Sequence, residues 1–293
     1  MQSRWKWLVG LPILAILFFW SYWPALERMV QAWIREADYS HGFLVVPFAG
    51  YLLWARRETF PGIEPGLSWG GLGLIALASL ARPLAAWFYL EPLDGYTIPV
   101  WLAGVCWFFL GRQCLAWCLP ALCFLAFMVP LPWRIEHALS LPLQGVATFG
   151  SCFLLQCLGL PAVAVGNTLL LGDIPLEVEQ ACSGLRLFVG FFAVSFAYVL
   201  LTERPWWQTF AIIAAAAPIA IVSNVLRITA TGLLYRYIGG SAARHFSHDA
   251  AGWVMILLAT GLLSLLLWYL NRLVIEVRPV ATLSSFSAPS VQQ

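Results

Sequence analysis

The chain has 293 residues, of which 61% are hydrophobic and only 10% are charged. Soluble globular domains carry about a quarter charged residues, so this composition excludes a water-soluble fold. The net charge of +2, without any long basic run, argues against nucleic-acid binding. Several apolar runs approach the roughly 20 residues that cross a bilayer as a helix, so the sequence predicts an all-α polytopic membrane protein.

Eight apolar runs are expected to cross the membrane, and the whole chain, 1–293, is expected to form one integral-membrane domain. In chain order the runs are 7–25, 42–55, 69–90, 96–111, 114–131, 184–202, 208–234 and 250–271. The first resembles a signal peptide after Arg4 and Lys6, but no small-residue cleavage site precedes Glu27, so we expect it to be retained as a span. Residues 282–293 form a polar stretch that predicts a disordered cytoplasmic tail.

A ninth apolar stretch, 139–160, decides the topology. Basic residues are enriched on the cytoplasmic side of membrane helices. With the N-terminus inside, Arg56 and Arg112 fall on that side. Arg204, Arg272 and Arg278 do so only if 139–160 does not cross. We therefore expect 139–160 to lie along the outer surface or to be re-entrant, with both termini of the chain in the cytoplasm.

Residues 132–183 are then extracytoplasmic, and part of this segment reads as β-structure. Its residues alternate in polarity and carry turn signals at Gly166-Asn167 and Gly172-Asp173. This pattern predicts one small β-hairpin or two. The last strand leads to Cys182, after which a helix begins.

Cys182 is the only one of the seven cysteines that lies at a polar boundary. Ser183 is a plausible N-cap for the following helix. The partial positive charge of a helix N-terminus lowers the pKa of a thiol, and Arg186 adds to that field. An interfacial cysteine without a role is the alternative. The other six cysteines lie in apolar stretches and are expected to pack as small hydrophobes, so we predict no metal and no cofactor.

Arg227 lies within the apolar run 208–234. An arginine there is costly and marks a functional candidate, although it could also extend to the outer headgroups. Asn224 and Ser223 share its helical face. By contrast, Arg82-Pro83 in the third run indicates a kink or a helix break without a catalytic role.

A third candidate group precedes the last span. His248 lies directly before it and has a suitable pKa for a general acid or base, and His245 is a competing candidate. Together a thiolate, a guanidinium and an imidazole on one membrane face indicate acyl transfer. The thiolate would attack a carbonyl, the guanidinium would stabilise the oxyanion and the imidazole would protonate the leaving amine.

Four motifs in this order resemble the exosortase/archaeosortase family of membrane-embedded cysteine transpeptidases: YSHGFLVVPFAGYLLWARR, ACSGLR, NVLR and HDAAGW. The resemblance covers roughly residues 39 to 255. It implies that Cys182 is the nucleophile, Arg227 the oxyanion-stabilising residue and His248 the general acid/base.

The resemblance also implies the substrate and the location. The expected partners are C-terminal sorting signals of exported proteins, each with a Pro-Glu-Pro-like (PEP) motif, a transmembrane helix and a basic tail. The expected location is the inner membrane, with the active site facing the periplasm and a link to exopolysaccharide production. The exact motif and the acceptor, water or an amine, stay open.

Two further residues are weaker candidates for the site. His41 lies on the outer face and could contact substrate, but it could equally order the second helix. Glu179 could pair with Arg186 or Arg227, although a solvated hairpin residue is the simpler interpretation.

Two other functions are alternatives. A transporter or channel would use Arg227 to bind an anionic substrate, but it would spread polar groups through the bilayer midplane and show repeats. A haem protein with His41 and His248 as axial ligands would show a Soret band, and only the position of these histidines supports it.

Overall fold

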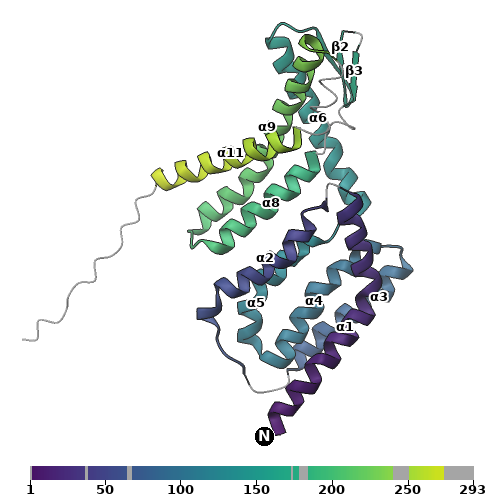
Figure 1. The fold of residues 1–293 in the computed structure, drawn as a ribbon, viewed down its shortest axis with the longest axis vertical. Coiled ribbons are helices and arrows are strands. Elements are labelled where there is room, and N and C mark those ends of the chain that lie inside the picture. Colours follow the sequence, from purple (N-terminus) through teal and green to yellow (C-terminus); the bar gives the residue numbers. More distant parts are fainter. Residues whose placement is uncertain are drawn as a thin grey trace, which may run out of the picture.

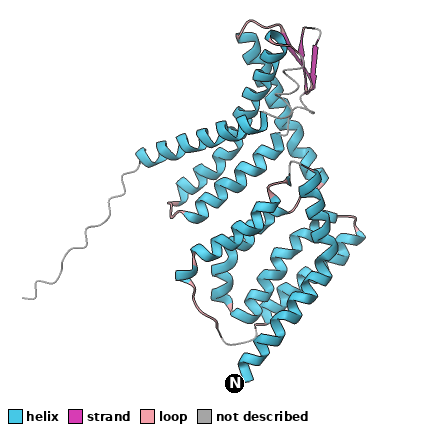
Figure 2. Ribbon diagram, viewed as in Figure 1, coloured by secondary structure: helices cyan, strands magenta, loops and turns pink. Residues whose placement is uncertain are grey.

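The structure is a computed structural model that describes residues 2–36, 39–64, 68–172, 174–177, 184–239 and 251–273. Helices dominate, and a small sheet lies at one end of the molecule (Figure 2). The helices are α1 (Gln2–Arg35), α2 (Gly42–Ala55), α3 (Trp69–Trp87), α4 (Glu91–Leu110), α5 (Arg112–Phe124), α6 (Trp133–Cys157), α8 (Gly184–Leu201), α9 (Trp206–Tyr237) and α11 (Ala251–Leu273). Two short 3₁₀ helices, η2 (Arg57–Thr59) and η3 (Leu125–Met128), follow α2 and α5.

All eight runs that were predicted to span the membrane are helical, but some bounds differ. α1 continues through Pro24 to Arg35, well beyond the predicted end at 25. α3 continues through Pro83 to Trp87, so of the predicted kink or helix break at Arg82-Pro83 the break does not occur. The tail, 282–293, lies outside the described residues.

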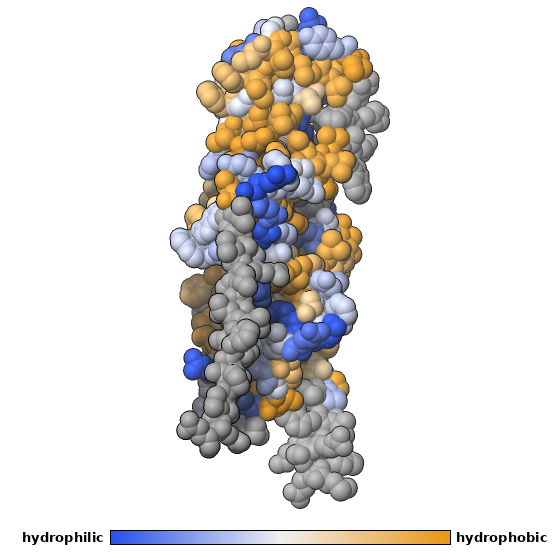
Figure 3. All heavy atoms as spheres, turned by 90° about the vertical axis from the view of Figure 1, so that its left-hand side faces the viewer, coloured by the Kyte–Doolittle hydropathy of each residue, from blue (hydrophilic) through white to orange (hydrophobic). Residues whose placement is uncertain are grey.

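Six of the described helices are long and apolar enough to cross a membrane, namely α1, α3, α4, α6, α9 and α11. Three shorter apolar helices cover Gly42–Ala55, Arg112–Met128 and Phe188–Leu201. Large apolar side chains face outward on the long helices. Trp69 of α3 and Trp206 of α9 are each more than 80% exposed. Figure 3 shows apolar residues over much of one face of the molecule. The chain is therefore a multi-pass membrane protein.

Helices α1 to α5 form one bundle. Its buried residues come from α1, α2, α4, α5 and η3, together with Ala193 and Ala197 of α8. α3 and α4 pack backbone to backbone, because a Cβ on Gly71 would lie 2.4 Å from the Phe108 nitrogen. Small residues let membrane helices approach in this way.

α9 packs against different partners along its two halves. Its first half, with Ile212, Ala216 and Ala220, is buried against α8 and α11. Its second half, with Ile228, is buried against α6 and the sheet. Arg227 lies between the part of α9 that packs on α8 and α11 and the part that packs on α6 and the sheet.

The sheet has three antiparallel strands in the order β1 (Ala162–Val165), β2 (Thr168–Leu171) and β3 (Ile174–Glu177). Val165 pairs with Thr168 across the Gly166-Asn167 turn, and Leu171 pairs with Ile174 across the second turn. The predicted hairpins are thus two hairpins that share β2. In Figure 1, α6 extends beside the C-terminal half of α9 towards the sheet rather than alongside α2, α8 and α11.

Candidate functional site

The structure describes one of the three predicted catalytic residues. Cys182 and His248 lie outside the described residues, as do Glu179 and the competing His245. The backbone of Arg186 belongs to the first turns of α8, but its side chain is outside the description. Among the described residues, the candidate site therefore consists of Arg227 and the helices around it.

Arg227 lies in a polar stretch of α9. Ser223 and Asn224, one turn earlier, are 0% and 2% exposed, and Arg227 itself is half-buried. Asn224 and Arg227 both have interaction partners. Since Ser223, Asn224 and Arg227 follow helical spacing, the polar face predicted from the sequence is present in the fold.

The start of α8 comes to the level of this stretch. α8 and α9 are consecutive helices, and they pack against each other after the connection formed by residues 202–205. Counting equal numbers of residues from that connection, Gly184 lies about level with Ser223, since both helices rise about 1.5 Å per residue. Arg227 is one turn further out.

The start of α11 comes to the same level. Near the other end of the helices, Arg204 Nη1 donates to Asn271 Oδ1 at 2.5 Å, which sets the register between the α8–α9 connection and α11. Counting from this contact, Ala251 lies about level with Asn224. The buried residues agree with that register, because Met255 and Ala259 share a core with Ala220 and Ala216. Figure 1 shows the N-terminal ends of α8 and α11 beside the middle of α9.

Two helices therefore begin at the height of an arginine. Each helix N-terminus carries partial positive charge from its unpaired N–H groups. The guanidinium of Arg227 adds a positive charge at the same level. Such a field stabilises a thiolate or a developing oxyanion.

α6 bounds one side of this region by crossing α9 at Val225. A Cβ on Gly150 would lie 2.9 Å from Val225 Cγ2, so glycine is needed for the approach. Ser151 Oγ donates to the carbonyl oxygens of Ala147, at 2.7 Å, and Val225, at 3.1 Å. The crossing holds the backbone of α9 two residues before Arg227.

A second polar contact ties α6 to the sheet. Asn167 Nδ2 donates to Gln144 Oε1 at 2.9 Å, and Gln144 Nε2 donates to Ser140 Oγ at 2.8 Å. Thr148 and Ser151, both fully buried, continue the same face of α6. The sequence interpretation gave Gln144 and Ser151 no role, although their helical spacing signals one polar face.

His41 precedes α2 and anchors the loop between α1 and α2. Its Nε2 lies 3.1 Å from the carbonyl oxygen of Phe127. Nearby, Trp33 Nε1 donates to the Met128 carbonyl at 2.8 Å, and the Leu131 N–H donates to Tyr39 Oη. Burial raises the pKa of Tyr39 above its ordinary value, so this hydroxyl stays protonated at neutral pH. These contacts favour the interpretation that His41 orders the start of α2.

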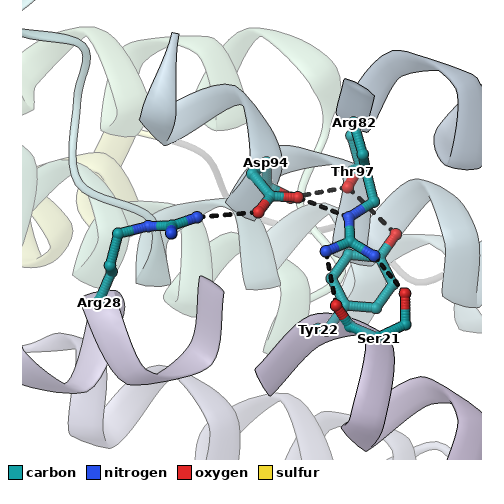
Figure 4. A network of polar contacts seen from close by, with 6 residues as sticks. All are labelled: Ser21, Tyr22, Arg28, Arg82, Asp94 and Thr97. Atoms are coloured by element: carbon teal, nitrogen blue, oxygen red, sulfur yellow. Dashed lines mark hydrogen bonds and ion pairs between the residues drawn. The ribbon is translucent and has the colours of Figure 1, made fainter. Parts of the chain in front are cut away.

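Arg82 lies in a network of polar contacts between helices, which Figure 4 shows. Its Nε donates to Asp94 Oδ1 at 2.6 Å, and its Nη2 donates to the Ser21 carbonyl at 2.7 Å. The guanidinium also lies 3.9 Å above the Tyr22 ring centroid. Arg28 binds the second oxygen of Asp94 at 2.9 Å. This network joins α1, α3 and α4.

The comparison with protein families gives one match. The model of the transmembrane exosortase family (Exosortase_EpsH) matches residues 33–265. No curated protein and no solved structure matches the chain. The matched range covers α2 to α9 entirely and most of α11, and it includes Cys182, Arg227 and His248. The chain therefore belongs to the transmembrane exosortase family.

Proposed function

We propose that this membrane exosortase is a cysteine protease and transpeptidase with Cys182 as nucleophile, Arg227 as oxyanion-stabilising residue and His248 as general acid and base. The observation that carries the proposal is the common level of three features: the start of α8, the start of α11 and Arg227. Cys182 is two residues before Gly184, and His248 is three residues before Ala251.

Covalent geometry turns this sequence distance into a spatial limit. An extended chain covers at most about 3.6 Å per residue. The Cα atom of Cys182 is therefore within about 7 Å of that of Gly184, and the Cα atom of His248 within about 11 Å of that of Ala251. These limits allow both residues to lie near the level of Arg227, which supports the proposal.

The reaction follows from the three groups. The Cys182 thiolate attacks the carbonyl carbon of the scissile peptide bond, and the Arg227 guanidinium stabilises the resulting oxyanion. The His248 imidazolium donates its proton to the leaving amine nitrogen, the C–N bond breaks and a thioester forms. Water or an acceptor amine then attacks the thioester, the imidazole takes its proton, and cleavage of the C–S bond restores the thiolate.

Neighbouring residues support these groups in the proposal. Asn224, buried one turn before Arg227, orients the guanidinium, and Arg186 in the first turns of α8 adds positive potential near the thiolate. His41 has a supporting role through the order of the α1–α2 loop.

The substrate class follows from the family resemblance. The enzyme cleaves C-terminal sorting signals that consist of a PEP-like motif, a transmembrane helix and a basic tail. It acts at the inner membrane with its active site facing the periplasm, and its products are linked to exopolysaccharide production. The acceptor is water or an amine.

The proposed topology has eight crossings with both termini in the cytoplasm. Five long helices and three shorter ones make these crossings, while α6 lies on the outer side. The path of α6 supports this arrangement, because α6 packs on the sheet and on the second half of α9. Its length and apolar composition alone would also permit a crossing.

Processing of a co-expressed substrate tests the proposal. The substrate carries an N-terminal epitope tag and a PEP-like sorting signal, and loss of its C-terminal segment is followed by immunoblot. We expect Cys182→Ala, Arg227→Ala and His248→Ala to abolish processing at unchanged enzyme abundance, and His245→Ala to process normally. Mass spectrometry of wild-type enzyme should detect the thioester on Cys182.

Matched controls separate chemistry from folding. Cys157→Ala removes an exposed cysteine, Arg236→Ala an exposed arginine of the same helix as Arg227, and His137→Ala an exposed histidine stacked on Trp133. All three should process at the wild-type rate. Normal cleavage in the three catalytic-residue variants would refute the mechanism.

A further inference from the structure

Three cysteines meet at the connection between α4 and α5. α4 ends at Leu110 and α5 begins at Arg112, so a single residue, Gly111, reverses the chain. Gly111 has a φ of 96°, a conformation that favours glycine. The reversal brings Cys106, in the last turns of α4, against Cys114 in the first turn of α5. Cys118 follows one turn later on the same face.

The sulfur atoms are arranged as metal ligands are. Cys106 Sγ lies 3.7 Å from Cys114 Sγ and 3.7 Å from Cys118 Sγ, and all three sulfurs are within 4.8 Å of one another. Three thiolates at about 2.3 Å from a tetrahedral Zn²⁺ would be about 3.8 Å apart. Two of the three separations therefore match those of ligands on one ion, and the third is no longer than 4.8 Å.

The three side chains differ in burial. Cys106 and Cys114 are buried, whereas Cys118 is partly exposed. Two ligands are thus held by packing, and the third is less enclosed. Three protein ligands leave the fourth tetrahedral position for water or an external ligand.

The charge of the surroundings suits a divalent ion. Three thiolates and one Zn²⁺ carry a net charge of −1, and the Arg56 guanidinium interacts electrostatically with Cys118. The backbone around Arg56 is itself held in place, because Trp117 Nε1 donates to the Arg56 carbonyl at 3.1 Å. A neighbouring positive charge offsets the cost of a charged centre in a medium of low dielectric.

The turn that forms the cluster is fixed from outside by Glu64. Its carboxylate accepts a hydrogen bond from the Arg112 N–H at 3.2 Å, and its own N–H donates to the Leu110 carbonyl at 3.1 Å. The residues on both sides of Gly111 are thereby held, which preorganises Cys106 and Cys114. Preorganised ligands lower the cost of metal binding.

We propose that Cys106, Cys114 and Cys118 form a binding site for one thiophilic divalent ion of the Zn²⁺ type. Binding replaces the thiol protons, so each ion bound releases them to solvent. The site is independent of the proposed catalytic residues. It lies at the beginning of α5, whereas His41 contacts Phe127 beyond the end of that helix.

Titration of the purified, reduced, metal-free protein tests this site. Co²⁺ is the spectroscopic probe, because thiolate ligation gives a charge-transfer band, and Zn²⁺ affinity is measured against a chromophoric chelator. We expect one equivalent to bind both the wild type and Cys182→Ala. Cys106→Ser, Cys114→Ser and Cys118→Ser should each weaken Zn²⁺ binding by about 100-fold or more.

Two exposed cysteines provide the controls. Cys123→Ser and Cys157→Ser should leave the affinity unchanged. Absence of a thiolate band in the wild type, loss of binding in Cys182→Ala, or equal loss in the controls would overturn the proposal.

A measurement on the wild type avoids any folding defect of the variants. Alkylation of Cys118 by a maleimide should be slowed several-fold by Zn²⁺, while alkylation of Cys123 should keep its rate. Peptide mass spectrometry reads both sites in one sample. Equal labelling of Cys118 with and without Zn²⁺ would contradict the proposal.

Discussion

Arg82 and Arg227, which both lie in apolar helices, have different kinds of surroundings. Arg82 is bound by a carboxylate, a serine and an aromatic ring from two neighbouring helices. Arg227 lies instead beside buried Ser223 and Asn224, at the level where two helices begin. An intramembrane arginine is thus not a functional sign by itself. Arg82 joins helices, whereas the proposed role of Arg227 is to meet a substrate.

The largest expected effect is on catalysis, from Arg227→Lys. Lysine keeps the charge but loses the planar guanidinium that presents several donors in fixed geometry. Removing one oxyanion donor costs about 10²–10³-fold in rate, so we expect processing to fall by about 10²-fold. The rate is measured on the epitope-tagged substrate, and the thermal unfolding temperature should stay unchanged. A variant as active as wild type would remove the distinction between the two arginines.

The next effect is on stability, from Asp94→Ala. This change takes the carboxylate from both Arg28 and Arg82, and breaking such a partly buried pair costs about 3 kcal/mol. Unfolding in detergent, followed by tryptophan fluorescence, should show a lower transition temperature, with normal processing per folded molecule.

Glu58→Ala serves as its control, because its pair with Arg57 is exposed and 3.9 Å long. Exposed pairs contribute at most about 1 kcal/mol, so this variant should unfold like wild type. An equal shift in the two variants would mean that the Asp94 network does not hold the bundle together.

The smallest effect is expected where α6 meets the sheet. Asn167→Ala removes the donor to Gln144, and a net loss of about 1 kcal/mol is typical for one hydrogen bond. The same unfolding measurement should show a small shift, and Gln31→Ala, at an exposed position of α1, should show none. A loss as large as that of Asp94→Ala would place the sheet contact among the main supports of the fold.

The predictable part of this molecule follows from periodicity and hydropathy. The apolar runs 42–55 and 184–202 correspond closely to α2 and α8, because both end at polar or proline-containing connections. The pair Gly166-Asn167 correctly predicted the turn between β1 and β2, since glycine permits the positive φ that this turn requires. The extension of α1 beyond Pro24 was missed, because proline inside a membrane helix is tolerated when neighbouring helices support the backbone.

Contacts between segments that are far apart in the chain could not be predicted from the sequence. Arg82 and Ser21 are 61 positions apart, and nothing in the pattern around either residue names the other. Cys114 and Cys118 share a helical face, which spacing predicts, but the approach of Cys106 depends on the one-residue reversal at Gly111. Among the proposed catalytic residues, Arg227 was singled out because a charge in an apolar run is rare. The roles of Cys182, Arg227 and His248 stay predictions.

The change of partners along α9 has a mechanical consequence. α9 is a continuous helix that packs on α8 and α11 along its first half and on α6 and the sheet along its second half. It therefore behaves as a stiff rod with a pivot between the two sets of contacts. If the sheet end of such a rod tilts, that end moves through a wide arc while the pivot hardly shifts. Arg227 lies close to that pivot, so such a tilt would displace its backbone less than that of the residues next to the sheet.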